Sequence, residues 1–123
     1  MHTGNMIYTK DKNYIILDWD MSAYSYSVID VSRMSGAEDF NVLSKRAYDD
    51  TTRKFEIFYK GYSKEKSLTT DEIHAIYDFI AILHYDLIAT IVITNQEKVM
   101  HDFIDEQFDW LMQWKKLCEK NRA

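Results

Sequence analysis

The stretch "TTDEIHAIYDFI", residues 69–80, decides the fold that the sequence predicts for the second half of the chain. Thr69 is followed three residues later by Glu72, the spacing of a capping box, in which the hydroxyl and the carboxylate each satisfy a free backbone N–H at a helix start. Apolar side chains then recur at intervals of three and four residues, as on one face of a helix. They are Ile73, Ile76, Tyr77, Ile80, Leu83 and Leu87. The pattern predicts a helix that begins near Thr69.

The apolar run that follows, "LIATIVIT" at residues 87–94, is rich in β-branched side chains. It suits either a strand or the end of the same helix, and we favour the helix. The apolar window from Phe79 to Ile93 is shorter than a membrane span and contains His84 and Asp86. We therefore expect a buried core element here.

A second capping-box spacing, "TNQE" at residues 94–97, predicts a second helix that begins near Thr94. Its apolar positions extend to the end of the chain: Met100, Phe103, Ile104, Leu111, Trp114 and Cys118. Two helices are thus expected within residues 69–120.

The first half of the chain has the patterns of strands. Apolar runs flank the turn "KDKN", "YSYSVIDVS" alternates with a period of two, and a further pair of runs flanks "DDTT". The predicted strands are residues 6–10, 13–20, 24–32, 42–48 and 54–59. Strands first and helices last predict an α+β fold, in which an antiparallel sheet from the N-terminal half packs against two C-terminal helices.

Length and composition indicate one domain over residues 1–123, with residues 1–5 as a disordered leader. The start "MHTGNMIYTK" lacks the basic and apolar regions of a signal peptide. Cys118 is the only cysteine, so no intrachain disulfide forms. These features predict a cytoplasmic protein.

The net charge of −5 is concentrated in one segment. Residues 70–109 contain nine acidic side chains and one basic side chain, Lys98. Such a segment repels nucleic acid and anionic lipid. We therefore expect a protein partner, and neither nucleic acid nor membrane.

The stretch "YIILDWD", residues 14–20, ends an apolar run with Asp18 and Asp20. It resembles the nucleophile motif of the haloacid-dehalogenase phosphohydrolases, and Asp49-Asp50 resembles their distal metal-binding pair. The resemblance implies a parallel sheet with helical crossovers, but no amphipathic helix pattern lies between residues 20 and 49. A turn at Asp18 and Asp20 is the favoured interpretation, and a metal-dependent site there is the alternative.

No other motif points to catalysis, a cofactor or a metal. The four histidines are scattered, and no pair has the spacing that presents two imidazoles on one helix face. The sequence therefore predicts no catalytic residue, no cofactor and no metal ligand.

The second predicted helix carries an acidic stripe: Asp102, Asp105, Glu106 and Asp109. Residues three and four apart are neighbours on a helix, so the stripe either complements the helix macrodipole or docks a basic partner. Asp18, Asp20, Tyr24 and Tyr26 form a second candidate surface, since aromatic residues are enriched at interfaces.

A small, acidic, aromatic-rich chain without a reaction motif has the traits of an inhibitor of a basic enzyme. In these traits it looks like the immunity proteins that bacteria pair with toxins. The sequence thus predicts a non-catalytic protein that blocks a basic toxin or nuclease-like enzyme. A small enzyme or ligand-binding domain built on Asp18 and Asp20 is the alternative.

Overall fold

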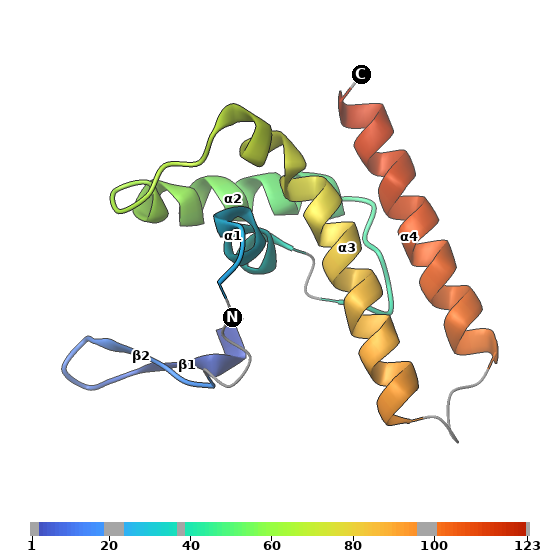
Figure 1. The fold of residues 1–123 in the computed structure, drawn as a ribbon, viewed down its shortest axis with the longest axis horizontal. Helices are drawn as coiled ribbons and strands as arrows, with labels where there is room; N and C mark the ends of the chain where they lie inside the picture. The colour runs from blue at the N-terminus through green and yellow to red at the C-terminus, as the bar shows by residue number, and fades with distance from the viewer. Residues whose placement is uncertain (1–2, 19–23, 37–38, 96–100, 123) are drawn as a thin grey trace.

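The computed structural model describes residues 3–18, 24–36, 39–95 and 101–122. They form an α+β fold that is mostly helical, with four helices and a small two-stranded antiparallel sheet near the N-terminus (Figure 1). A short 3-10 turn, η1 (Thr3–Asn5), precedes the sheet. The other elements are β1 (Met6–Tyr8), β2 (Tyr14–Ile16), α1 (Ser27–Ser35), α2 (Ala47–Tyr62), α3 (Thr70–Thr94) and α4 (His101–Arg122).

The predicted hairpin across "KDKN" is present, with strands shorter than expected. Met6 pairs with Ile16 and Tyr8 with Tyr14, and the turn closes through Lys12, whose φ is 61°. In Figure 1 the hairpin lies apart from α3 and α4. The expectation of an antiparallel sheet over residues 6–60 that packs against the two C-terminal helices is therefore wrong. Among the described residues, only the hairpin forms a sheet.

Residues 24–32 do not form a strand, because most of this stretch belongs to α1. Val28, Val31, Ser32 and Ser35 are buried, at the spacing of a helix face. The Ser32 and Ser35 hydroxyls donate to the carbonyls four residues earlier, each at 2.7 Å. Serine can therefore lie on the buried face of a helix. For this reason the alternation of serine with apolar residues did not mark one exposed and one buried side of a strand.

The predicted hairpin of residues 42–48 and 54–59 is also wrong, because Ala47–Tyr62 is one helix, α2. The "DDTT" segment lies in its first two turns, where Asp49 and Asp50 suit the positive end of the helix. The aromatic side chains of α2 pack on the core at helical spacing. They are Tyr48, Phe55, Phe58, Tyr59 and Tyr62. Tertiary packing thus overrides their strand propensity.

The helix predicted from Thr69 is confirmed. The Thr69 hydroxyl accepts from the Glu72 N–H at 3.2 Å, and the Glu72 carboxylate accepts from the Thr69 N–H at 2.8 Å. This helix, α3, continues to Thr94, so residues 87–94 are helical as favoured. The predicted cap at Thr94 is wrong: Thr94 ends α3, and its hydroxyl donates to the Thr90 carbonyl at 2.8 Å. Glu97, the other half of that expected box, lies outside the described residues.

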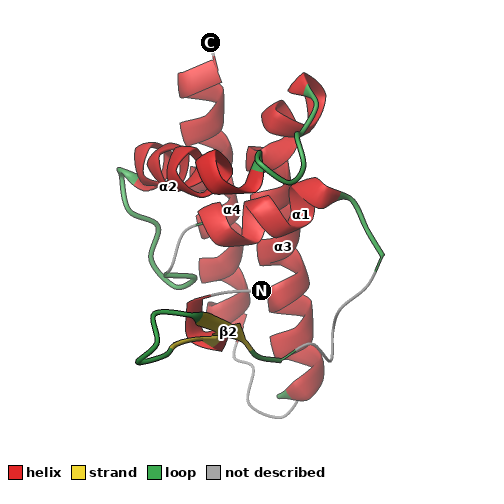
Figure 2. Ribbon diagram, turned by 90° about the vertical axis from the view of Figure 1, so that its left-hand side faces the viewer, coloured by secondary structure: helices red, strands yellow, loops and turns green. Residues whose placement is uncertain are grey.

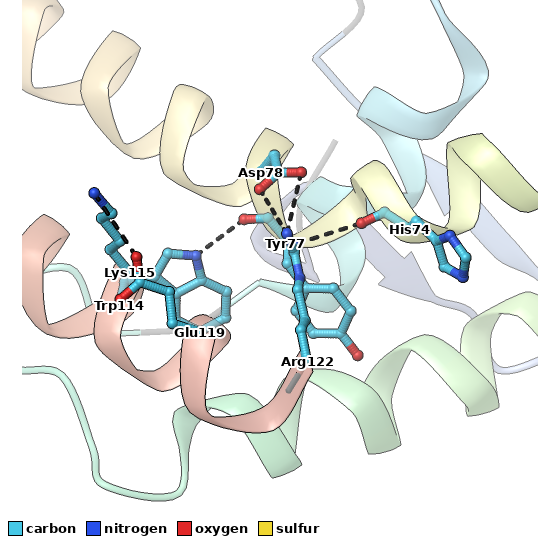
Figure 3. Close-up of polar contacts among 7 residues, drawn as sticks. All are labelled: His74, Tyr77, Asp78, Trp114, Lys115, Glu119 and Arg122. Atoms are coloured by element: carbon cyan, nitrogen blue, oxygen red, sulfur yellow. Dashed lines mark hydrogen bonds and ion pairs between the residues drawn. The ribbon is translucent and has the colours of Figure 1, made fainter.

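The core lies among α1, α2, the first half of α3 and α4 (Figures 1 and 2). Trp114 is 1% exposed, and its indole N–H donates to the Tyr77 carbonyl at 2.9 Å. Near the C-terminus, Arg122 pairs with Asp78 at 3.1 Å (Figure 3). These contacts fasten the second half of α4 to the first half of α3. The first half of α4 therefore faces the second half of α3.

Candidate functional site

The acidic stripe lies on α4, as the sequence predicted. Asp102, Asp105, Glu106 and Asp109 are all exposed. The buried side chains of this helix point the other way, toward the core: Gln107, Trp110, Trp114 and Cys118. Within the described residues, none of the four carboxylates of the stripe forms an ion pair, whereas Glu119 and Asp78 pair with Lys115 and Arg122 at the opposite end of α4 (Figure 3).

The second candidate surface is not assembled as a sheet face. Tyr24 and Tyr26 are exposed and precede α1. Asp18 is exposed after β2, with a φ of 60°, and its carboxylate accepts from the Asn5 amide at 3.0 Å. Asp20 lies outside the described residues.

A metal-dependent site finds no support in the part of the chain that the structure describes. Those residues contain no group of three or more His, Cys, Asp or Glu that could hold a metal ion. Asp49 and Asp50, the supposed distal pair, begin α2, and Asp50 lies 4.0 Å from both Arg46 and Arg53.

Sequence reasoning missed an apolar groove between the second half of α3 and the first half of α4. The groove has a volume of about 290 Å³. Its lining is almost entirely apolar: Tyr85, Ile88, Ala89, Val92 and Ile93 from α3, and Ile104, Gln107, Phe108 and Leu111 from α4. The buried side chains of α3 are Ile76, Ile80 and His84, and the groove residues follow them along the helix.

The expectation that the window Phe79–Ile93 is a buried core element is therefore wrong in its second half. His84 is the last buried side chain of α3, and the helix continues for ten further residues. Ile93 is 68% exposed and Tyr85 is 58% exposed, while Phe108 across the groove is 54% exposed. Large apolar side chains are thus exposed on both walls of the groove.

Gln107, one of the groove residues, forms a polar pair with His84. His84 is 7% exposed and Gln107 is fully buried, and the His84 Nε2 lies 2.9 Å from the Gln107 Oε1. The His84 ring stacks on Trp110 at 3.8 Å between centroids. Burial lowers the pKa of His84, against the opposing effect of its hydrogen bond to Gln107, so the imidazole is neutral at pH 7. Among the described residues, the buried Nε2 of Gln107 finds no hydrogen-bond partner.

Carboxylates border the groove on both helices. On α3, Asp86 lies one turn from the groove residue Ala89. On α4, Asp105 lies one turn from the groove residue Phe108. We call Asp86 and Asp105 the rim carboxylates. Apart from Lys98, the sequence from Phe79 to Trp114 contains no lysine or arginine.

Among the described residues, α3 is one helix whose length and apolar composition would allow it to cross a bilayer. Only 17% of its most apolar window is buried in the fold. The core helix of a soluble protein passes the same test, so this property alone assigns no location.

Comparison with protein-family models, with curated proteins and with solved structures gives no significant match for this chain.

Proposed function

We propose that this chain is a non-catalytic cytoplasmic protein that binds and neutralises a basic enzyme or toxin, in the manner of an immunity protein. The observation that carries the proposal is the acidic stripe of α4. Its four carboxylates are exposed and, within the described residues, have no cationic partner.

Helix electrostatics explain only part of this stripe. The macrodipole acts mainly on the first turn of a helix, and only Asp102 lies in the described first turn of α4. Asp109 is two turns further along. Like charges three and four residues apart destabilise a helix by roughly 0.2–0.5 kcal/mol per pair. A basic partner would relieve this repulsion on binding.

The same charges favour capture of a basic protein. Clustered surface charge steers an oppositely charged partner and raises its association rate. An inhibitor must bind its target before the target acts, so rapid association serves this function directly. Suppression of the partner would then follow from covering its active surface.

The test begins with capture of a partner from the source cell on the immobilised protein, with identification by mass spectrometry. We expect a basic protein whose activity falls to background at one equivalent of inhibitor. Asp105→Lys with Asp109→Lys should slow association about tenfold and reduce its dependence on salt, because screening acts on long-range attraction.

The matched control is Glu56→Lys with Glu65→Lys, which changes the net charge equally at exposed positions in and after α2. It should leave the association rate near that of the wild type. Equal slowing by both pairs of substitutions would show that only net charge matters. Capture of acidic proteins alone would contradict the proposal.

A further inference from the structure

The apolar groove is a feature that the proposed function does not explain. Its walls come from the second half of α3 and the first half of α4, and both helices leave large apolar side chains exposed there. Exposed apolar surface is lost when a partner covers it, which is the main favourable term in protein association.

We propose that the groove is the docking site for one amphipathic helix of the basic partner. Apolar side chains of that helix enter the groove, and lysines or arginines on its flanks meet the rim carboxylates Asp86 and Asp105. This inference rests on the proposed function and specifies the part of the partner that is recognised.

The dimensions of the groove suit a short helical segment. From Tyr85 to Ile93 the α3 wall is about 12 Å long at 1.5 Å per residue, which is slightly more than two helical turns. Helices that lie in grooves place anchors at positions i, i+3 or i+4, and i+7. A volume of about 290 Å³ accommodates a few such side chains.

The acidic side chains around the groove favour a cationic ligand. A second copy of this chain would bring its own rim carboxylates against those of the first, so self-association through this face is opposed. Helices that lie on a membrane surface combine an apolar face with lysine and arginine, whereas here the flanking charges are acidic. A cationic amphipathic helix satisfies both the apolar walls and the acidic rims.

Gln107 offers a polar contact in the lining of the groove. This side chain is fully buried, and its Nε2 has no partner in the part of the chain that the structure describes. Buried polar groups are almost always hydrogen-bonded. We therefore expect one anchor of the partner helix to carry an acceptor oxygen, as serine or asparagine does.

The first test uses a synthetic 18-residue peptide of leucine and lysine, with leucines three and four apart so that they form one helical face. Binding is measured by isothermal titration calorimetry at two salt concentrations. We expect the peptide to bind and become helical, and a peptide of the same composition with scattered leucines to bind about tenfold more weakly or worse. A leucine–glutamate analogue should not bind. Equal affinity for the ordered and scattered peptides would overturn the inference.

Ala89→Trp fills the groove and should weaken peptide binding about tenfold or more. Its matched control is Ile57→Trp on α2, where the native side chain is 65% exposed. Circular dichroism checks that both variants fold. Equal affinities of Ala89→Trp and wild type would overturn the inference. So would a dimer in sedimentation that Ala89→Trp dissociates, or wild-type binding to phosphatidylcholine vesicles that Ala89→Trp abolishes.

The same variant separates this inference from the proposed function. If a captured basic partner binds wild type and Ala89→Trp equally but responds to Asp105→Lys with Asp109→Lys, the groove is not its docking site and the inhibitor function stands. If the peptide result holds but a captured partner keeps full activity when bound, the groove is a docking site and the inhibitor function fails.

Discussion

Trp114→Ala should destabilise the protein by about 4 kcal/mol, within the range of 3–5 kcal/mol for truncation of a buried tryptophan. Trp114 is 1% exposed, its ring lies 5.9 Å from that of Trp110 and 6.3 Å from that of Tyr77, and its indole donates to the Tyr77 carbonyl. The lost hydrogen bond accounts for about 1 kcal/mol of the total. The remainder comes from lost apolar burial and the cavity left between α3 and α4.

The assay is urea denaturation followed by far-UV circular dichroism, which does not depend on tryptophan emission. With an m value of about 1.5 kcal/mol/M, the midpoint should fall by about 2.7 M. Trp114→Phe keeps an aromatic ring and should cost about 1–2 kcal/mol, so it remains informative if Trp114→Ala does not fold. Met112→Ala, at a site 51% exposed, should stay within about 0.5 kcal/mol of wild type. Equal midpoints for Trp114→Ala and Met112→Ala would refute the attachment of α4 described here.

Three further predictions concern single side chains. Thr69→Ala removes the capping hydroxyl of α3 and should lower the unfolding free energy by about 1 kcal/mol in the same urea assay; an unchanged midpoint would contradict the cap. Burial lowers the pKa of His84 below its ordinary value of about 6.5, so the unfolded chain takes up a proton first as the pH falls. The unfolding free energy should therefore decrease from pH 7 toward pH 5.5, and less steeply in His84→Gln; parallel pH profiles would argue against a buried neutral imidazole. Burial raises the pKa of the Cys118 thiol to about 11, so its reaction with a disulfide reagent at pH 8 should be roughly a hundredfold slower in the folded protein than in urea; similar rates in both would contradict its burial.

Short sequence patterns predicted the structure correctly where the interactions join residues that are close in the sequence. Thr69 and Glu72 form their hydrogen bonds within one turn, and the hairpin of residues 6–16 depends on a short turn between two apolar runs. Both were predicted correctly for this reason. The expected cap at Thr94 has the same spacing of residue types as Thr69 and Glu72. The Thr94 hydroxyl instead donates to the Thr90 carbonyl within the last turn of α3.

The first half was mispredicted because its helices carry β-forming residues and serines. Val28 and Val31 belong to a strand-like alternation as well as to a helix face, and only packing against α2 and α3 decides between them. A serine that donates to its own helix can be buried at no hydrogen-bonding cost, as Ser32 shows.

The groove was not predictable from periodicity, because it depends on where the buried part of α3 ends in the tertiary fold. One signal was present in the sequence: apart from Thr90 and Thr94, residues 87–94 are all apolar, which is more apolar surface than one buried helix face needs. The pairing of His84 with Gln107, twenty-three residues apart, requires the tertiary arrangement. The acidic stripe, in contrast, was predictable from the sequence, because residues three and four apart on any helix lie on the same side.

Hydrogen–deuterium exchange on the captured complex tests the central claim most directly, because it maps the covered surface without any substitution. We expect slower exchange on partner binding in residues 85–94 of α3 and 101–112 of α4, with the hairpin of residues 6–16 unchanged. Slower exchange in the hairpin or around Tyr24 and Tyr26, with α3 and α4 unaffected, would contradict the claim that this protein binds its partner through the acidic stripe and the apolar groove.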